Sequence, residues 1–303
     1  MKKKALIIGF GSIGKKHFNA LKKILSIENI YILSRRELGF KNSFSDLNNI
    51  KIINPDYILI CVETSLHFKY LKYVVSKLDK KIILVEKPIF SKNCNLNIRS
   101  NKVFVGYNLR LNPLILFIKN YIKNKNIYSF NINTQSYLPN WRKNINYSNS
   151  YSADKKKGGG VLLDLSHEID IFLWFFKKIT PKYFLNKKIS NLNIKSDDYL
   201  LLIAKFKKNS YINLTQSYFS RKSIRNIFIS GEKFSLEADL NKNSINLTNK
   251  NSNKILKYST DISKTYYLLN LKLLNKNYKD ICTYNEGRKV MRFIDNLKNN
   301  KYL

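Results

Sequence analysis

The chain has 303 residues, of which 44% are hydrophobic, so it can bury substantial cores and is expected to form two globular domains. Its 55 lysines and arginines exceed its 20 acidic residues and give a formal net charge of +35. These basic residues are spread along the chain, which favours compositional drift over a nucleic-acid-binding arm. A binder of DNA or RNA remains a weaker alternative, while an anionic substrate would in either case be attracted to such a surface.

Membrane, export and metal signals are missing from the sequence. The longest apolar stretch, 169–176, is interrupted by Asp170 and is too short to cross a bilayer. Only four apolar residues precede Gly9, so no signal peptide is expected. The three cysteines are odd in number and lack CxxC spacing. We therefore expect a reduced, cytoplasmic protein without a disulfide framework, a metal site or a membrane partner.

The N-terminal stretch predicts a strand, a glycine turn and a helix. The apolar run 5–8 suits a buried parallel strand, and the motif Gly-x-Gly-x-x-Gly follows it directly. In this context the glycines permit a tight turn, a close approach of the pyrophosphate and close helix packing, while the helix N-terminus attracts phosphate. A purely structural glycine turn is the alternative. The predicted cofactor contacts in this turn are Gly9, Gly11, Ser12, Ile13 and Gly14.

A second strand, 29–33, ends in Ser34, Arg35 and Arg36, with no acidic residue before Glu37. A site that prefers NAD(H) usually has an acidic residue here, bonded to the ribose 2′-hydroxyl. A hydroxyl and two guanidinium groups suit a 2′-phosphate instead. The sequence therefore favours NADP(H), with NAD(H) as the other candidate. Two solvated arginines at a strand end are the alternative interpretation.

The third strand, 56–62, leads through Thr64 and Ser65 into a helix that presents Leu71, Val74, Val75 and Leu78 on its apolar face. Either hydroxyl could cap that helix. Taken alone, His67 is expected on the helix surface rather than as a ligand.

A fourth strand, 81–85, ends in Glu86-Lys87-Pro88. Ligands bind outside the carboxyl ends of parallel strands, so Lys87 is well placed to meet a substrate. A fifth strand, 103–105, precedes Gly106 to Pro113 and a helix to about Lys123, where the β/α alternation ends.

The next segment changes character. An alternating strand, 128–137, is followed by a polar and aromatic stretch, 139–157, which reads as a long functional loop. Three glycines then open a largely buried helix that reaches Phe176. Asp164 and His167, three residues apart, are expected on one face of that helix, and Asp170 continues it.

Beyond Pro181 the sequence reads as successive strands, which indicates an antiparallel sheet. Two helices, at about 265–276 and 286–299, end the chain. The predicted strands are 181–189, 197–207, 210–219, 224–230, 233–240, 243–248 and 254–259.

Together these segments resemble the Gfo/Idh/MocA family, the glucose–fructose oxidoreductase and inositol dehydrogenase group, over nearly the whole chain. The motifs that carry the resemblance are the glycine turn, Thr64 to His67 (with Ser65 in place of the family's proline), Glu86-Lys87-Pro88, Gly106 to Pro113, Gly158 to Asp170, and Glu286 to Val290.

The resemblance implies a Rossmann domain at 1–112 and a C-terminal α/β domain at 113–303 with an open, mostly antiparallel sheet, which commonly forms homodimers or homotetramers. It implies cofactor contacts from Thr64, His67 and Glu86 as well. Lys87, Asp164 and His167 would be catalytic, with Lys87 and His167 also touching the substrate. The aspartate's role is in doubt, because many members place it four residues before the histidine. Further predicted substrate contacts are Arg110, Trp141 and Arg142.

The predicted function is NAD(P)-dependent hydride transfer on a sugar or sugar derivative, and resemblance of the 141–153 loop adds an association with bacterial surface-polysaccharide biosynthesis. His167 titrates near neutrality and suits a general acid/base, while the Lys87 ammonium would stabilise an alkoxide. A non-catalytic, nucleotide-sensing regulatory protein of the same fold is the alternative, and retention of both residues argues against it.

Overall fold

The computed structural model describes residues 3–142 and 146–299, and the chain divides into two units. Unit 1 comprises Met1–Leu111 and Asp261–Met291, and unit 2 comprises Asn112–Thr260 and Arg292–Leu303. The expected boundary after residue 112 lies within one residue of this division. The expected contiguous C-terminal domain differs, because residues 261–291 belong with the N-terminal unit.

Short apolar runs build the seven-stranded sheet of unit 1. β1 lies centrally, fully buried and hydrogen-bonded to parallel β2 and β4. The strand order is β15-β6-β5-β4-β1-β2-β3, and only the β15–β6 pair is antiparallel. The strands are β1 Ala5–Ile8, β2 Ile30–Leu33, β3 Ser43–Phe44, β4 Tyr57–Ile60, β5 Ile82–Val85, β6 Lys102–Val105 and β15 Cys282–Thr283. The sequence predicted five of these strands; the two-residue strands β3 and β15 are too short to show a pattern.

Two helices distant in sequence, α1 and α7, pack together in unit 1. α7 buries Leu269, Leu273 and Leu274 in the core cluster that contains Ile7 and Leu59. The apolar face expected for α3 is buried as well. The helices are α1 Ser12–Leu21, α2 Asn49–Ile53, α3 His67–Lys77, α7 Ile262–Leu274 and α8 Tyr284–Lys298, whose last turns belong to unit 2, with 3-10 turns η1 Ile27–Asn29, η2 Thr64–Leu66 and η3 Asn108–Leu111.

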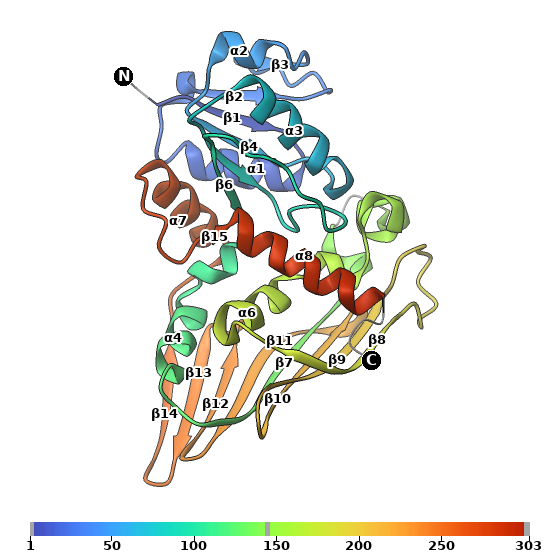
Figure 1. Ribbon diagram of the computed structural model, residues 1–303, viewed down its shortest axis with the longest axis vertical. Helices are drawn as coiled ribbons and strands as arrows, with labels where there is room; N and C mark the ends of the chain where they lie inside the picture. Colours follow the sequence, from blue (N-terminus) through green and yellow to red (C-terminus); the bar gives the residue numbers. More distant parts are fainter. Residues whose placement is uncertain (1–2, 143–145, 300–303) are drawn as a thin grey trace. The chain divides into compact units, whose positions relative to one another are not determined.

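Unit 2 contains an eight-stranded sheet in the order β14-β13-β12-β11-β7-β10-β9-β8 (Figure 1). Its pairs are antiparallel except for β7 with β10, so the mostly antiparallel sheet is confirmed. The strands are β7 Ile127–Tyr137, β8 Thr180–Lys187, β9 Tyr199–Lys207, β10 Ser210–Ser217, β11 Phe219–Gly231, β12 Phe234–Asp239, β13 Ser244–Asn249 and β14 Ser252–Lys257. Each lies within a few residues of its predicted range, because alternating burial on a half-covered sheet is visible in sequence.

The helices of unit 2 are α4 Pro113–Ile122, α5 Val161–Asp164 and α6 His167–Phe176. α6 packs on the sheet through ring contacts of Phe172 and Phe176 with Phe130. The single helix expected from the glycines to Phe176 is wrong: Leu165 leaves helical geometry at ψ 29°, and Ser166 separates the two helices. In its described residues, 138–142 and 146–160, the segment before them holds the short 3-10 turns η4 Leu138–Trp141, η5 Tyr147–Asn149, η6 Tyr151–Ala153 and η7 Lys155–Lys157.

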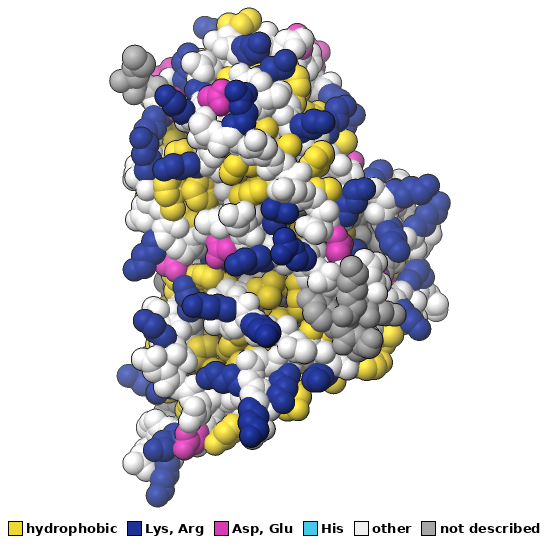
Figure 2. Space-filling view, viewed as in Figure 1, with side chains coloured by type: hydrophobic (Ala, Val, Ile, Leu, Met, Phe, Trp, Pro, Cys, Tyr) yellow, Lys and Arg dark blue, Asp and Glu magenta, His cyan; other side chains and the backbone are white. Residues whose placement is uncertain are grey.

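The basic side chains are scattered over the visible face rather than gathered in one patch (Figure 2), as diffuse compositional charge predicts. Within 3–142 and 146–299, no helix combines the length and apolar character needed to cross a membrane. The same ranges contain no cluster of three or more His, Cys, Asp or Glu side chains able to hold a metal ion.

Candidate active site

The glycine turn after β1 has the shape of a phosphate cradle. Gly9 has a φ of +93°, which a side chain rarely adopts, and a Cβ on Gly14 would collide with the Gly9 carbonyl. Gly11 is the N-cap of α1, and no atom lies within 4 Å of where its Cβ would be. The first N–H groups of α1 therefore have no capping side chain from Gly11, and the space beside Gly11 is open, which fits a pyrophosphate. Ser12 and Ile13 open that helix, as predicted.

Ser34, Arg35 and Arg36 follow β2 at the carboxyl edge of the sheet, beside this turn. Arg36 Nη2 donates to the Phe10 carbonyl inside the glycine turn at 2.8 Å, and Arg36 N donates to Ser34 Oγ at 3.1 Å. Both arginine side chains are exposed. The turn and the Arg36 guanidinium thus lie together, and Arg35 is the neighbouring residue in the chain, an arrangement that suits a 2′-phosphate.

His67 is buried, with 1% of its surface exposed, so the expected helix-surface position is wrong. Its Nδ1 lies 2.9 Å from the Pro88 carbonyl and its Nε2 lies 3.1 Å from the Val62 carbonyl. Burial lowers the pKa of His67, outweighing the hydrogen bonds to Pro88 and Val62, which raise it. The ring ties the loop after β4 to the loop that carries Lys87.

Thr64 is buried in η2, next to this histidine in sequence. The cap expected from Thr64 or Ser65 is not formed, because the N-cap position of α3 is Leu66. A 3-10 turn, which the local pattern did not reveal, occupies the place where the helix was expected to begin.

Glu86 and Lys87 follow β5 at the same edge. Glu86 is 6% exposed; its Oε1 lies 2.8 Å from His17 Nε2, and its Oε2 accepts the Lys87 backbone N–H at 3.2 Å. Burial raises the pKa of Glu86, but the His17 hydrogen bond and the Lys87 charge and backbone N–H outweigh it and leave the pKa below its ordinary value. Lys87 is half-buried and precedes a cis proline.

These contacts occupy Glu86 with protein groups. The sequence missed His17 as its partner, although a histidine on the apolar face of α1 was the available signal.

Arg110 lies in the interior of unit 1, 2% exposed, with Nη1 3.1 Å from Glu286 Oε1. Burial raises the pKa of Glu286, but the nearby Arg110 charge and the hydrogen bonds from Thr283 outweigh it and lower the pKa overall. This burial and pairing argue against the predicted contact between Arg110 and a substrate.

In unit 2, Asp164 is held by two tyrosines. Tyr151 Oη donates to Oδ1 at 2.7 Å and Tyr218 Oη donates to Oδ2 at 2.8 Å. Burial, and then the Asp164 charge, raises the pKa of both tyrosines well above the ordinary value, so both hydroxyls remain protonated donors. Both carboxylate oxygens of the buried Asp164 are therefore engaged, which suits an anchoring group.

His167 is the first residue of α6 and is half-buried. The break before it is tied to the sheet, because Gln216 Nε2 donates to the Leu165 carbonyl at 2.7 Å. Glu168, 1% exposed, accepts from Arg225 Nη2 at 2.6 Å and from Thr134 Oγ1 at 3.0 Å. These buried contacts fix the backbone on which His167 is placed.

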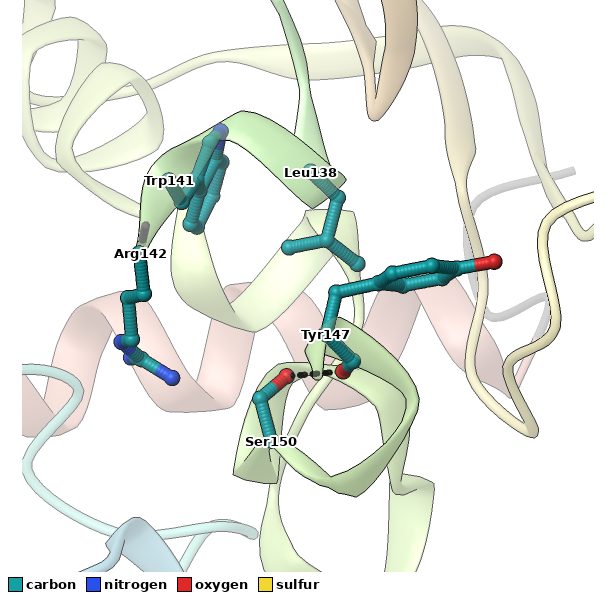
Figure 3. Close-up of a pocket in the computed structure, with 5 residues that line it drawn as sticks. All are labelled: Leu138, Trp141, Arg142, Tyr147 and Ser150. Carbon is teal, nitrogen blue, oxygen red and sulfur yellow. Dashed lines mark hydrogen bonds between the residues drawn. The ribbon is translucent and has the colours of Figure 1, made fainter. Parts of the chain in front are cut away.

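Trp141 and Arg142 approach the same two tyrosines. The Trp141 ring packs edge-on to Tyr218 with 5.1 Å between centroids, and the Arg142 guanidinium lies 5.2 Å from the Tyr151 ring centre. Figure 3 shows Trp141 and Arg142 on one side of a small hollow, with Leu138 and Tyr147 opposite and Ser150 at its edge. The loop residues predicted to touch a substrate thus connect through tyrosines to Asp164.

The sequence-predicted site residues therefore form two groups, each within one unit. Unit 1 brings together the glycine turn, Ser34 to Arg36, and the loops that hold His67 and Lys87. Unit 2 brings together Asp164 and the Trp141-Arg142 loop, with His167 at the head of the next helix. Tyr218 was missed, because it lies 54 residues from Asp164 in sequence.

Solved structures share this fold at low sequence identity. Levoglucosan dehydrogenase in complex with NADH aligns with 99% of this chain and 96% of its own, at 15% identity and a TM-score of 0.80. The UDP-N-acetylglucosamine 3-dehydrogenase GnnA of Acidithiobacillus ferrooxidans aligns over 99% and 97%, at 14% identity and a TM-score of 0.77. The WlbA dehydrogenase of Bordetella pertussis, in complex with NADH and UDP-GlcNAcA, aligns over 99% and 96%, at 15% identity and a TM-score of 0.75.

No curated protein sequence matches the chain. Residues 3–97 match the family described as oxidoreductase family, NAD-binding Rossmann fold, and residues 119–301 match the oxidoreductase family, C-terminal alpha/beta domain. These matches cover both units and most of the chain, in the order that the motifs predicted. The chain therefore belongs to the Gfo/Idh/MocA oxidoreductase family.

Proposed function

We propose that the protein is an NADP(H)-preferring dehydrogenase that transfers a hydride between nicotinamide and a carbinol or carbonyl of a sugar derivative. The observation that carries the proposal is that this chain of the oxidoreductase family contains both an ammonium group, Lys87, and an imidazole, His167. It also has the glycine turn after β1, with open space beside Gly11. A regulatory protein that only senses the nucleotide has no need of this pair.

The glycine turn and the N-terminus of α1 would hold the pyrophosphate, with Ser34, Arg35 and Arg36 on the adenosine 2′-phosphate. The bound nicotinamide supplies the hydride acceptor or donor. His167 takes the hydroxyl proton when the carbinol is oxidised and returns it in the reverse reaction. Lys87 stabilises the developing alkoxide through its positive charge. We assign Asp164 an anchoring role, because both of its oxygens accept tyrosine hydrogen bonds.

The names of the similar structures, levoglucosan dehydrogenase and UDP-N-acetylglucosamine 3-dehydrogenase, support a sugar substrate. The aromatic faces of Trp141 and Tyr147 suit the apolar face of a sugar, and Arg142 suits a phosphate, nucleotide or carboxylate group. We propose an anionic sugar derivative of bacterial surface-glycan metabolism, processed by a homodimer or homotetramer.

The direct test is turnover of a panel of neutral, acidic and nucleotide-linked sugars with NADPH, NADP, NADH and NAD. Lys87→Met and His167→Asn should lower kcat by about 10² or more, as loss of a general acid/base predicts, with melting temperature and cofactor affinity near wild type. Turnover confined to simple non-sugar alcohols would contradict the substrate class. Cofactor binding without turnover of any panel member would favour the regulatory alternative.

The anionic group is tested separately. Arg142→Gln should raise KM for an anionic sugar about tenfold or more, the scale of a charged hydrogen bond, and leave KM for its neutral analogue nearly unchanged. Arg221→Gln is the matched control, since Arg221 also stacks on a tyrosine of this unit, 3.8 Å from the Tyr137 ring centre. Equal effects on both sugars would exclude an anion contact by Arg142.

A further inference from the structure

A chain of four buried polar side chains crosses unit 1 and ends beside Lys87. It runs from Tyr57 on β4 through Asn270 on α7 and His17 on α1 to Glu86 after β5, and none of the four exceeds 6% exposure. Tyr57 Oη donates to Asn270 Oδ1 at 2.9 Å, Asn270 Nδ2 lies 3.0 Å from His17 Nδ1, and His17 Nε2 lies 2.8 Å from Glu86 Oε1. Buried polar chains of this kind persist only when each member is satisfied.

The orientation of Asn270 decides where the His17 proton lies. Asn270 Nδ2 also donates to the Tyr266 carbonyl at 2.7 Å. Rotating the amide by 180° would place Oδ1 against that carbonyl oxygen, and two acceptors would repel. The Nδ2 group must therefore face both Tyr266 and His17. His17 Nδ1 then accepts a hydrogen bond, and the ring proton of the neutral imidazole lies on Nε2.

This tautomer makes His17 a donor to the carboxylate. Glu86 Oε1 receives the Nε2 proton, and Oε2 receives the backbone N–H of Lys87 at 3.2 Å. The backbone of Gly106 also packs closely against this carboxylate, because a Cβ added to Gly106 would lie only 2.6 Å from Glu86 Oε1. The carboxylate is held on two sides and by two donors, one of which is the backbone that carries the Lys87 ammonium.

We propose that His17 is a positioning residue for Lys87, acting through Glu86, and that Asn270 of α7 and the Glu86 carboxylate together hold His17 in the tautomer with its proton on Nε2. The proposal rests on the proposed function, because the chemical role of Lys87 belongs to it.

The tautomer is measured without any substrate. The chain has only three histidines, so ¹⁵N-histidine NMR gives three ring patterns, and His17→Gln identifies the one that belongs to His17. Wild type should show Nε2–H, and Tyr57→Phe should keep it, since Asn270 still donates. Asn270→Leu should keep this tautomer too, because Glu86 still accepts the Nε2 proton, but it should shift the Nδ1 resonance, which loses its hydrogen-bond donor. An Nδ1–H tautomer in wild type, or an Nδ1 resonance that does not move in Asn270→Leu, would overturn the assignment.

Kinetics separate positioning from stability. His17→Gln should lower kcat about tenfold or more, the scale of a small misplacement of a catalytic group, with NADPH affinity unchanged. In a Lys87→Met background it should cause no further loss, because both changes act through one ammonium. An equal loss in both backgrounds, or none in either, would overturn the proposal. If His17→Gln fails to fold, Glu86→Gln replaces it in the same pair of backgrounds. It should lower kcat in the wild-type background and cause no further loss in Lys87→Met.

Asn101→Ala is the stability control. Asn101 is a buried amide of the same unit. Its Oδ1 accepts from Lys81 N and its Nδ2 donates to the Leu78 carbonyl, and neither bond involves a residue of the chain from Tyr57 to Glu86. It should lower the melting temperature and leave kcat at the wild-type value; a kcat loss matching that of His17→Gln would assign the His17 effect to destabilisation. Wild-type protein without turnover would instead contradict the proposed function, and the tautomer pattern would still decide whether His17 holds Glu86.

Discussion

Individual side chains of this protein owe their chemistry to burial and to the partners that burial selects. Asp164 resembles a catalytic carboxylate in sequence, yet two tyrosine hydroxyls occupy its oxygens. His67 resembles a surface histidine, yet it lies between two backbone carbonyls. Arg35 and Arg36, by contrast, remain exposed at the strand end where sequence placed them.

Cofactor preference depends on those exposed arginines. Arg35→Ala should weaken NADPH binding about tenfold, the scale of one charged hydrogen bond, and leave NADH binding nearly unchanged, because only NADPH carries the 2′-phosphate. Fluorescence titration of both cofactors measures this. Arg99→Ala, at an exposed arginine paired with Asp79, is the matched control. Wild type that binds NADH as tightly as NADPH would contradict the preference.

Acid sensitivity should depend on His67. Burial holds its folded-state pKa below the ordinary 6.5, so as pH falls below about 6.5 the unfolded chain takes up a proton that the folded protein does not. Stability is therefore lost with decreasing pH in this range. His67→Gln should flatten the unfolding free energy between about pH 5 and pH 7, measured by urea titration. The lowered pKa of Glu86 acts below its ordinary value of 4.5, so it does not obscure this window. Parallel wild-type and variant curves would contradict the expectation.

Secondary-structure elements position the site by where they end. β1, β2, β4 and β5 are parallel, so the segments that follow them meet at one edge. In unit 2 the important end is the break between α5 and α6, where the Leu165 carbonyl accepts a hydrogen bond from Gln216 on β10. A helix interrupted at this point is tolerated because the sheet supplies the missing donor.

Gln216→Leu should therefore destabilise the protein by about 1–3 kcal/mol, the cost of leaving a buried carbonyl and the Glu168 carboxylate short of a donor. Urea unfolding measures this. Asn213→Ala on the same strand removes a bond from Asn213 Nδ2 to Asn131 Oδ1 at a half-buried position, and should change stability by no more than about 0.5 kcal/mol. Equal losses in the two variants would show that the break is not supported by Gln216.

The whole chain folds as two units, and both are discontinuous in sequence. Unit 1 recruits 261–291 after most of unit 2 has been built along the chain, and 292–303 then belong to unit 2 again. Segment 261–291 brings four core residues, Leu269, Leu273, Leu274 and Ile281, together with Asn270. Burial of four such side chains contributes roughly 6–12 kcal/mol, comparable with the whole stability of a domain.

A chain that stops at Leu111 should therefore not fold cooperatively, although it contains all but the last, two-residue strand of the unit 1 sheet. The same segment joined through a flexible linker to 261–291 should unfold in one cooperative transition and bind NADPH. Circular dichroism during heating and cofactor titration measure both outcomes. Cooperative unfolding of residues 1–111 alone would show that α7 is dispensable to the core.

The sequence alone determined the elements whose cause is local. Four-residue apolar runs specify strands buried on both faces, the Gly9 turn requires a positive φ, and alternation from 127 onward specifies a half-covered sheet. These patterns also placed Arg35 and Lys87 at the ends of strands. Local spacing is sufficient for such features because each depends on residues a few positions apart.

Only the tertiary structure decided which groups those residues meet. His17 reaches Glu86 across 69 positions and Asn270 across 253, and Tyr218 reaches Asp164 across 54. The packing of 261–291 into unit 1 and the helix break at Leu165 likewise depend on contacts between residues that are far apart in the sequence. A buried hydrogen bond forms with whichever donor the packed chain brings within about 3 Å, and no periodicity in the sequence encodes that pairing.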